Sequence, residues 1–592
     1  MPDQIQSYKV ICSGGLNSNE NHLDLSDNNP GAATRLVNYE VSLFGGYRRI
    51  EGFAEYNSPY AEVKGETTTA RGPVLCTALY ADPTLGNIII AARKDPTTNT
   101  YSFYRSVLNN HWVKYSLTTT RVGTGGNPNP SHHKASVEAG TPGFAALTRL
   151  TTDGTTTVNK VRFTKFNFGD GNRIVFVDGV NPAIVFDGTS WEVILKTNTG
   201  GTNSPGGPNC LDKPALVDNF ENHLFLSGDT SNSAVVAYSA ASDPFQFDTS
   251  PGAGQLVVGF DVVQFKPFRT NLFIFGDNAI KKATPDVSAG FVIDNVTANV
   301  GCVARDSVVE IGGDLIFLSP DGFRPVAGTS RIGDVEIETI SKNIQQVLGD
   351  LSVTFDLTTL NAVVIRSKSQ VRFFIGDDTT TVPSSFGIIG GLRSADQKLG
   401  WEFGTLLGIR ASCCDSAYIK TTTSSNLNIT QELVVHGDYD GKVYQQEIGK
   451  TFNGVDILSV YSTPYFDLGD TETRKIFRKV NAFVRAEGPL TMQMGLTYDW
   501  DDPRVTNPAA YSQDSAGAPV KYGALGVDYA DRADGTIDPN SNVIYGGTDK
   551  PIITTSIQGS GYAIQLTFVT LGAFDPYSVQ GMVFEFSVAG RR

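Results

Sequence analysis

The chain has 592 residues and a formal net charge of −14, from 47 Lys and Arg against 61 Asp and Glu. Charged residues make up only 18% of it, while 40% is hydrophobic and 10% aromatic. This composition excludes a coiled coil, a disordered tail protein and a basic nucleic-acid binder. Abundant Gly, Thr and aromatic residues with only 4 Met favour strands over long helices. The sequence therefore predicts an all-β protein.

The first 72 residues form the first predicted unit. They begin MPDQIQSYKV, which has neither a basic stretch nor an apolar core, so we expect no signal peptide. The polar, turn-rich stretch SGGLNSNENHLDLSDNNPG predicts an extended N-terminal arm that wraps a neighbour. Two short helices are expected in the chain, Ala32–Tyr39 and Thr339–Leu348, the second ending at Gly349.

Residues 73–454 repeat one pattern, in which a short apolar strand reaches a polar turn and a second strand returns. The repeats begin near residues 88, 174, 224, 272, 315, 371 and 433. Most gaps are close to the ~40–50 residues of a propeller blade. We therefore predict a β-propeller of about seven blades, within a range of six to eight, with an insertion at 118–160. The alternative is a run of unrelated hairpins in two sandwiches.

Residues 455–592 contain longer strands with strict alternation, which predicts an antiparallel β-sandwich. A long loop is expected at 501–549, where Asp, Asn, Pro and Gly dominate. One predicted strand carries Arg474, Lys475, Arg478 and Lys479. We interpret it as an exposed sheet face or a subunit contact.

Residue patterns for catalysis or cofactor binding are absent from the sequence. It has no phosphate-binding loop, zinc-protease motif or nucleophile elbow. The pair His132–His133 lies in a predicted loop, and six scattered cysteines suggest reduced thiols. Acidic groups at Asp438–Asp440 and Asp499–Asp502 are interpreted as turn residues, with weak calcium binding as the alternative. No stretch reaches 18 apolar residues, so we expect no membrane-spanning segment. From the missing motifs we expect no catalytic residue, no cofactor and no metal.

The segment Leu36–Phe53, LVNYEVSLFGGYRRIEGF, resembles the N-terminal motif of the tail nozzle proteins of short-tailed bacteriophages, also called tail tubular protein B or packaged-DNA stabilisation protein. Similar matches occur at 222–248, 268–282, 301–324 and 577–592. The motif is carried by Asn38, Glu40, Val41, Gly45, Gly46, Tyr47, Arg48, Arg49, Ile50, Gly52 and Phe53.

This resemblance implies a structural virion protein, made in the host cytoplasm and located in the virion tail. It implies a homohexameric conduit below the portal and its adaptor ring, which retains packaged double-stranded DNA and passes it during ejection. The implied partners are other copies of the chain, the tail adaptor or head-to-tail connector protein, tail fibres or spikes, and the viral DNA. Two alternatives remain open: a phage propeller that binds or cleaves host-surface glycan, and a bacterial adhesion or scaffold propeller.

Overall fold

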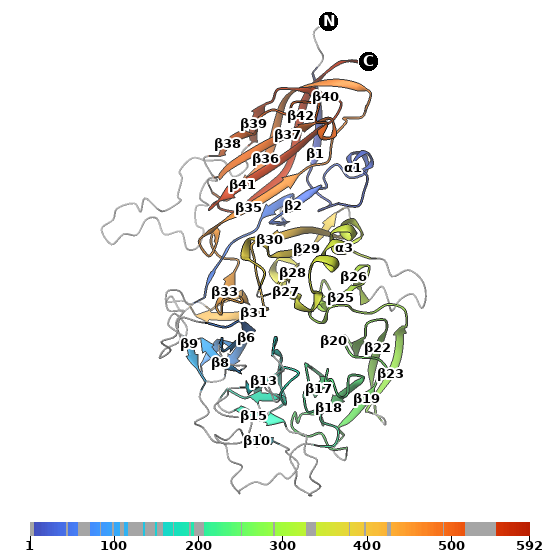
Figure 1. Ribbon diagram of the computed structural model, residues 1–592, viewed down its shortest axis with the longest axis vertical. Helices are drawn as coiled ribbons and strands as arrows, with labels where there is room; N and C mark the ends of the chain where they lie inside the picture. The colour runs from blue at the N-terminus through green and yellow to red at the C-terminus, as the bar shows by residue number, and fades with distance from the viewer. Residues whose placement is uncertain are drawn as a thin grey trace, which may run out of the picture.

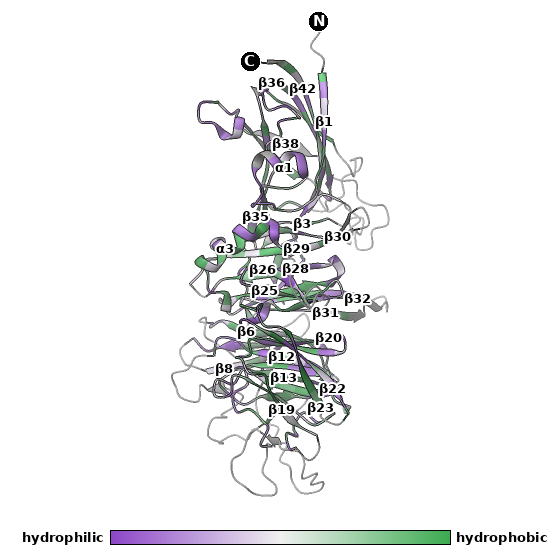
Figure 2. Ribbon diagram, turned by 90° about the vertical axis from the view of Figure 1, so that its right-hand side faces the viewer, coloured by the Kyte–Doolittle hydropathy of each residue, from purple (hydrophilic) through white to green (hydrophobic). Residues whose placement is uncertain are grey.

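The computed structural model describes residues 5–591, except 43–44, 57–70, 83–84, 97–99, 107–111, 116–133, 137–148, 151–157, 170, 189–190, 195–206, 250–251, 288–289, 327–338, 378, 396–397, 423–427, 489 and 516–551. The molecule is elongated, with a ring of sheets at one end and a β-sandwich at the other (Figure 1). Both chain ends lie at the tip of the sandwich. The two parts stay at opposite ends when the view is turned by 90° (Figure 2).

Seven antiparallel blades make up the ring in the described residues, the last two within one larger sheet, which confirms the predicted propeller. Each is a short meander, because apolar strands are joined by turns rich in Gly, Asn and Asp. The first four blades are β6–β9 (Val74–Asp82, Gly86–Lys94, Thr100–Ser106, Trp112–Lys114), β12–β15 (Arg162–Asn167, Asn172–Val177, Ile184–Phe186, Trp191–Ile194), β16–β19 (Leu216–Phe220, His223–Ser227, Val235–Tyr238, Gly254–Val257) and β20–β23 (Gln264–Phe268, Asn271–Phe275, Ile280–Asp286, Gly290–Thr297).

The last three blades are β24–β26 (Val309–Ile311, Asp314–Ser319, Gly322–Pro325), β27–β30 (Asn361–Ile365, Gln370–Ile375, Phe386–Ala395, Lys398–Leu407) and β31–β33 (Cys413–Thr422, Asn428–Gly437, Val443–Gln446). The first strand of each blade lies innermost, and β31 contacts β6, so the seventh blade meets the first. The short strands β10 (Lys134–Ser136) and β11 (Arg149–Leu150) lie within the predicted insertion and extend the second and first blades.

The seventh blade is completed by a strand from the N-terminal segment. β5 (Phe53–Glu55) pairs antiparallel with β33, so that Phe53 lies opposite Gln446 and Glu55 opposite Tyr444. It also runs parallel to β34 (Thr451–Phe452). The ring is therefore closed by residues that precede the first blade.

The sandwich has two sheets. The first runs β3 (Tyr39–Val41), β4 (Tyr47–Arg49), β42 (Tyr577–Arg591), β36 (Thr473–Ala486) and β39 (Ile552–Ser556), with β1 (Ile5–Ile11) on β42 and β40 (Ser560–Gly561) on β36. The second contains β2 (Arg35–Val37), β35 (Val455–Ser462), β41 (Ile564–Gly572), β37 (Leu490–Tyr498) and β38 (Tyr511–Ser515). β38 lies within the segment predicted as a loop, and most of the remainder of that segment is outside the described residues.

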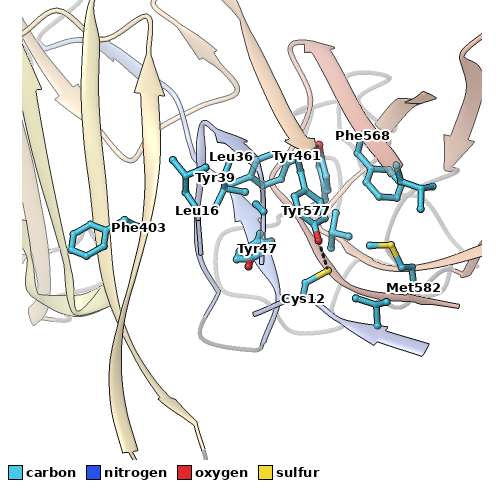
Figure 3. Packing of buried hydrophobic residues seen from close by; sticks show 14 of the residues in the cluster. Cys12, Leu16, Leu36, Tyr39, Tyr47, Phe403, Tyr461, Phe568, Tyr577 and Met582 are labelled. Carbon is cyan, nitrogen blue, oxygen red and sulfur yellow. Dashed lines mark hydrogen bonds between the residues drawn. The ribbon is translucent and has the colours of Figure 1, made fainter. Parts of the chain in front are cut away.

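β2 joins the two parts of the molecule. It pairs antiparallel with β35 of the sandwich and parallel with β30 of the propeller, so one sheet runs through both. Aromatic side chains from both parts meet at this place, among them Tyr39, Phe403, Tyr461 and Tyr577 (Figure 3). The sandwich and the propeller therefore share one continuous apolar core.

Three local predictions differ from the structure. Ala32–Tyr39 is not a helix: this segment contributes to the strands β2 and β3. Leu36, Val37 and Tyr39 are buried there between neighbouring strands. The second helix, α3, spans Gln345–Thr354 after a 3-10 turn at Lys342–Ile344, and Gly349 lies inside it. The described residues of 5–55 do not form an extended arm. They form β1 to β5 and the helix α1 (His22–Asn28), and their strands pair with strands of both the propeller and the sandwich.

Candidate functional site: an interdomain junction and a propeller cavity

Asn38 links propeller and sandwich through its side-chain amide. Its Nδ2 donates to the carbonyl oxygens of Leu407 (3.0 Å) and Leu458 (2.8 Å), and its Oδ1 accepts from the Leu407 amide (2.9 Å). Leu407 belongs to β30 and Leu458 to β35. Asn38 has a φ of 56°, a left-handed conformation that Asn adopts more readily than most residues. The backbone turn and the amide together explain why Asn suits this position.

Glu40 is the centre of a buried charge network. Its carboxylate accepts from Arg48 (2.7 Å) of the same motif and from Lys368 (2.9 Å) and Arg372 (3.3 Å) of the propeller. The side chains of Glu40 and Arg372 are only 2% and 1% exposed. Burial alone would raise the pKa of Glu40, but the charges of Lys368, Arg372 and Arg48 hold this pKa at about 2. Glu40 therefore stays ionised at neutral pH.

The two arginines of the motif reach the sandwich. Arg48 also pairs with Glu51 (2.8 Å) and with Glu487 (2.8 Å), which follows β36. The Arg49 guanidinium is fully buried and donates to backbone carbonyls at Ile457 (3.2 Å), Gly572 (2.6 Å) and Phe574 and to the Ser459 hydroxyl (3.2 Å). Burial lowers the pKa of Arg49.

The remaining motif residues fix the backbone at the same junction. Gly45 and Gly46 have φ values of 88° and 79°, which confirms the predicted turn with left-handed glycines. A Cβ on Gly46 would lie 2.0 Å from the Val579 carbonyl oxygen, and one on Gly52 would lie 2.1 Å from the Thr451 carbonyl oxygen. The Tyr47 hydroxyl donates to the Gly31 carbonyl (2.9 Å) and accepts from the Gly15 amide (3.0 Å).

A second candidate site is a cavity of about 420 Å³ at the centre of the propeller. All seven innermost strands contribute side chains to its wall, including Thr77 of β6, Arg162 of β12, Asp218 of β16 and Lys266 of β20. Cys76, Cys413 and Cys414 also line it, and burial raises the pKa of each thiol. Protonated thiols are poor nucleophiles and poor metal ligands.

Three of the four carboxylates that line this cavity, Asp218, Asp306 and Asp415, are bound to cations, and the fourth, Glu310, is exposed. Asp306 pairs with Arg162 (2.7 Å) and Lys160 (2.9 Å), and Asp218 pairs with Lys266 (2.7 Å). Burial alone would raise the pKa of Asp306, but Arg162 and Lys160 hold it well below its usual range. A glycosidase acid needs a raised pKa to hold its proton, which is the opposite condition.

The acidic groups noted in the sequence also have partners. Asp438 accepts from Arg410 (2.6 Å), Asp440 from the Tyr444 hydroxyl (2.6 Å), and Asp502 from Arg504 (2.7 Å). Asp499 accepts from the amides of Tyr562 and Ala563. Across the described part of the chain, no three His, Cys, Asp or Glu side chains gather as metal ligands would. His132–His133 lies outside the described residues. No helix among the described residues is long and apolar enough to cross a membrane.

Sequence reasoning missed the partners of the motif in the propeller. Lys368, Arg372 and Glu447 join the network with Glu40, more than 300 residues away in the chain. Only one local signal was available: Arg372 interrupts the apolar run VRFFI, where a charged residue needs a buried partner. Which partner it has depends on the fold.

No family model and no curated protein sequence matches the chain. Among solved structures it is similar to an exo-β-1,3-galactanase from Phanerochaete chrysosporium, with 10% identity over 90% of this chain and 100% of that one and a TM-score of 0.21. It is also similar to a family 43 arabinoxylan arabinofuranohydrolase from Bacillus subtilis, with 11% identity, coverage of 90% and 96%, and a TM-score of 0.23. Hsv2 from Kluyveromyces lactis covers 56% of this chain and 98% of its own, at 10% identity and a TM-score of 0.24. Likenesses at these TM-scores carry no argument about activity.

Proposed function

We propose that this protein is the tail nozzle of a short-tailed bacteriophage. In this proposal six copies form a conduit below the portal and adaptor ring, and the conduit retains packaged double-stranded DNA and passes it during ejection. The observation that carries the proposal is the role of the nozzle-like motif. Asn38 binds both the propeller and the sandwich, and Glu40 of the sandwich binds Lys368 and Arg372 of the propeller. Arg49 joins the two sheets of the sandwich, and Phe53 lies on the strand that closes the propeller.

A rigid joint is what a conduit subunit needs. A tail component transmits force between its neighbours when DNA under pressure leaves the capsid, so its two domains must not swing apart. The Glu40 network holds the two domains together by buried charged hydrogen bonds, and the Arg49 carbonyl contacts hold the two sheets of the sandwich together in the same way. The proposed partners are other copies of this chain, the adaptor protein, and tail fibres or spikes.

The second candidate is a propeller that binds or cleaves host-surface glycan. The observation in its favour is the polar cavity at the propeller axis, where ligand sites of propellers commonly lie. The ion pairs there argue against hydrolysis, because Arg162 and Lys160 hold the pKa of Asp306 well below its usual range and Lys266 binds Asp218. We therefore propose no enzymatic activity.

Two experiments separate these functions. Negative-stain images of the particle, labelled with antibody against this protein, are expected to show a six-fold ring below the portal vertex. A glycan-release assay on host cells tests the alternative, with Asp306→Asn and Asp218→Asn as variants. The nozzle proposal would be wrong if glycan release depended on either carboxylate. It would also be wrong if the antibody labelled the fibre tips and no ring, and in both cases the glycan-binding function would take its place.

A further inference from the structure

Four strands of the first sandwich sheet, β1, β42, β36 and β39, together have a charge opposite to that of the chain. These four strands contain seven Lys or Arg residues and a single acidic residue, Glu585. The remaining residues therefore contain 40 Lys or Arg and 60 Asp or Glu, a net charge of −20. A basic surface on an acidic protein is a specific feature of this sheet.

Two arginines of β36 lie on the outer face of the sheet. Burial alternates along this strand, and Arg474 and Arg478 are exposed while Lys475 turns inward. Arg474 donates to the Ser560 hydroxyl (3.1 Å) and Arg478 to the Ser587 hydroxyl (3.2 Å), so both guanidinium groups are held over the sheet. Lys9 on β1 is exposed on the same sheet.

Apolar side chains lie between these cations. Ile11 is opposite Gly581, Gly581 is opposite Phe483, and Phe483 is opposite Ile552, so the three large side chains stand in one row across four strands. Ile11 is 60% exposed, Phe483 39% and Ile552 55%. Gly581 adds no side chain, which leaves the row flat. We call the outward positions of these four strands the basic sheet face.

We infer that the basic sheet face is the docking surface for a second copy of this chain. Exposed aromatic and aliphatic side chains combined with arginine are typical of protein interfaces. Contact with the DNA backbone would use the cations but not the apolar row. Two basic faces repel each other, so the face must meet a different surface of the partner, and the rest of each copy is net −20. A second copy of the chain therefore offers the acidic surface that the basic sheet face requires, and it is present wherever this protein is made.

Such a contact is heterologous, and repeated rotation about one axis closes it into a ring. The inference rests on the proposed function in one respect: it names the surface through which the hexamer would form. The basic sheet face belongs to the sandwich, at the end of the molecule opposite the propeller (Figure 1).

The test is a photo-crosslink from the centre of the apolar row. p-Benzoylphenylalanine replaces Phe483, and this protein is mixed with ¹⁵N-labelled wild-type chain at the highest soluble concentration. The expected product joins position 483 of one copy to a ¹⁵N peptide from an acidic region of the other. The inference would be overturned if no crosslink between two copies formed, or if position 483 crosslinked only to peptides of its own, unlabelled copy.

Charge reversal then tests the face itself. Arg474→Glu with Arg478→Glu is expected to lower the crosslink yield at least tenfold. Lys342→Glu with Arg504→Glu makes the same change in net charge at exposed positions away from this face and is expected to leave the yield unchanged. Near-ultraviolet circular dichroism of both double variants verifies that they fold.

Three further outcomes separate the inference from the proposed function. Equal yields from both double variants would overturn the docking surface, and a six-fold ring in the particle would still support the nozzle. A face-dependent crosslink without any ring in the particle would support the docking surface and contradict the nozzle. Crosslinking to duplex DNA, with DNA affinity lost on reversal of Arg474 and Arg478, would assign the face to nucleic acid and overturn the inference.

Discussion

At the scale of single residues, Glu40 is the side chain on which the junction most depends. Removing one partner of a buried charge network costs about 3–5 kcal/mol, because the other charges stay buried without compensation. We expect Glu40→Gln to lower the free energy of unfolding by an amount in this range, measured by denaturant titration. Glu487→Gln is the matched control: it contacts the same Arg48, but its side chain is 46% exposed, so the loss should be under about 1 kcal/mol. Equal losses would contradict the central role of Glu40.

The two glycines of the motif turn give a second residue-scale prediction. Both have positive φ, so alanine at either costs about 1–2 kcal/mol in backbone strain. Nothing lies within 4 Å of a Cβ on Gly45, whereas a Cβ on Gly46 meets the Val579 carbonyl. We expect Gly46→Ala to reduce the thermal unfolding temperature clearly more than Gly45→Ala. A larger effect at Gly45 would show that the close contact with β42 is unimportant.

His436 makes the junction sensitive to acid. It is 1% exposed, its Nδ1 lies 3.2 Å from Gln446 Nε2, and burial followed by the charge of Arg372 lowers its pKa to about 3. Between pH 6.5 and 3 the unfolded chain therefore binds a proton that the folded chain does not, so stability falls as the pH falls through this window.

The measurement is the unfolding free energy from pH 7 to pH 5, above the range where Glu40 titrates. We expect the wild-type protein to lose roughly 2 kcal/mol from this histidine over the interval, at about 1.4 kcal/mol per pH unit below 6.5. His436→Gln should give a flatter profile. A profile with the same slope in the variant would assign the acid sensitivity to other groups.

At the scale of elements, β5 is the strand whose removal has a predictable local effect. Phe53 lies against Phe452, Tyr444 and His436, with ring centroids 5.0 to 5.2 Å apart. Phe53→Ala should cost about 3–5 kcal/mol and open the seventh blade first. Hydrogen exchange is expected to speed up in β5, β33 and β34, and Phe53→Leu should retain most of the protection. Faster exchange confined to the sandwich would contradict this assignment.

The elements that the sequence predicted best are those whose partners are close in the chain. Strands such as His223–Ser227 and Asn271–Phe275 pair with the segments just before and after them, and their apolar runs and turns indicated the blades. β2 and β5 were not predicted, because each pairs with strands hundreds of residues away and is too short to show alternation. The same reason hid the partners of Glu40, whereas the turn at Gly45 and Gly46 was predicted from residue type alone.

At the scale of the whole molecule, net charge governs assembly. Six copies at −14 each carry −84 around one axis, and their repulsion is screened only beyond a Debye length of ~8 Å. We expect the dilute purified protein to be mainly monomeric in light scattering at low and physiological salt. Docking on a preformed adaptor ring raises the effective concentration of neighbouring copies and should produce the hexamer. A stable hexamer in dilute low-salt solution would contradict this balance.

The channel gives the last prediction at this scale. If the basic sheet face is covered by the neighbouring copy, the rest of the chain has a net charge of −20, so we expect few Lys or Arg side chains to face the lumen and DNA to slide without strong phosphate contacts. Gel shift of the isolated protein, whose net charge is −14, should show weak binding to duplex DNA that changes little with salt. Tight binding with a steep salt dependence, or a lumen ringed by Lys and Arg, would exclude this sliding mechanism.

The closure of the propeller by β5 has a consequence for how the chain reaches its native state. Phe53 pairs with Gln446, so the ring closes through a contact between residues almost 400 positions apart. Contacts of such high sequence separation form late, because the entropy of a long loop must be lost before any pairing energy is gained. Refolding therefore passes through an open ring in which the pairing edge of β33 and the apolar site for Phe53 are exposed. Such edges are sites of aggregation, so folding yield should fall steeply with chain concentration and recover when a chaperone holds the open ring.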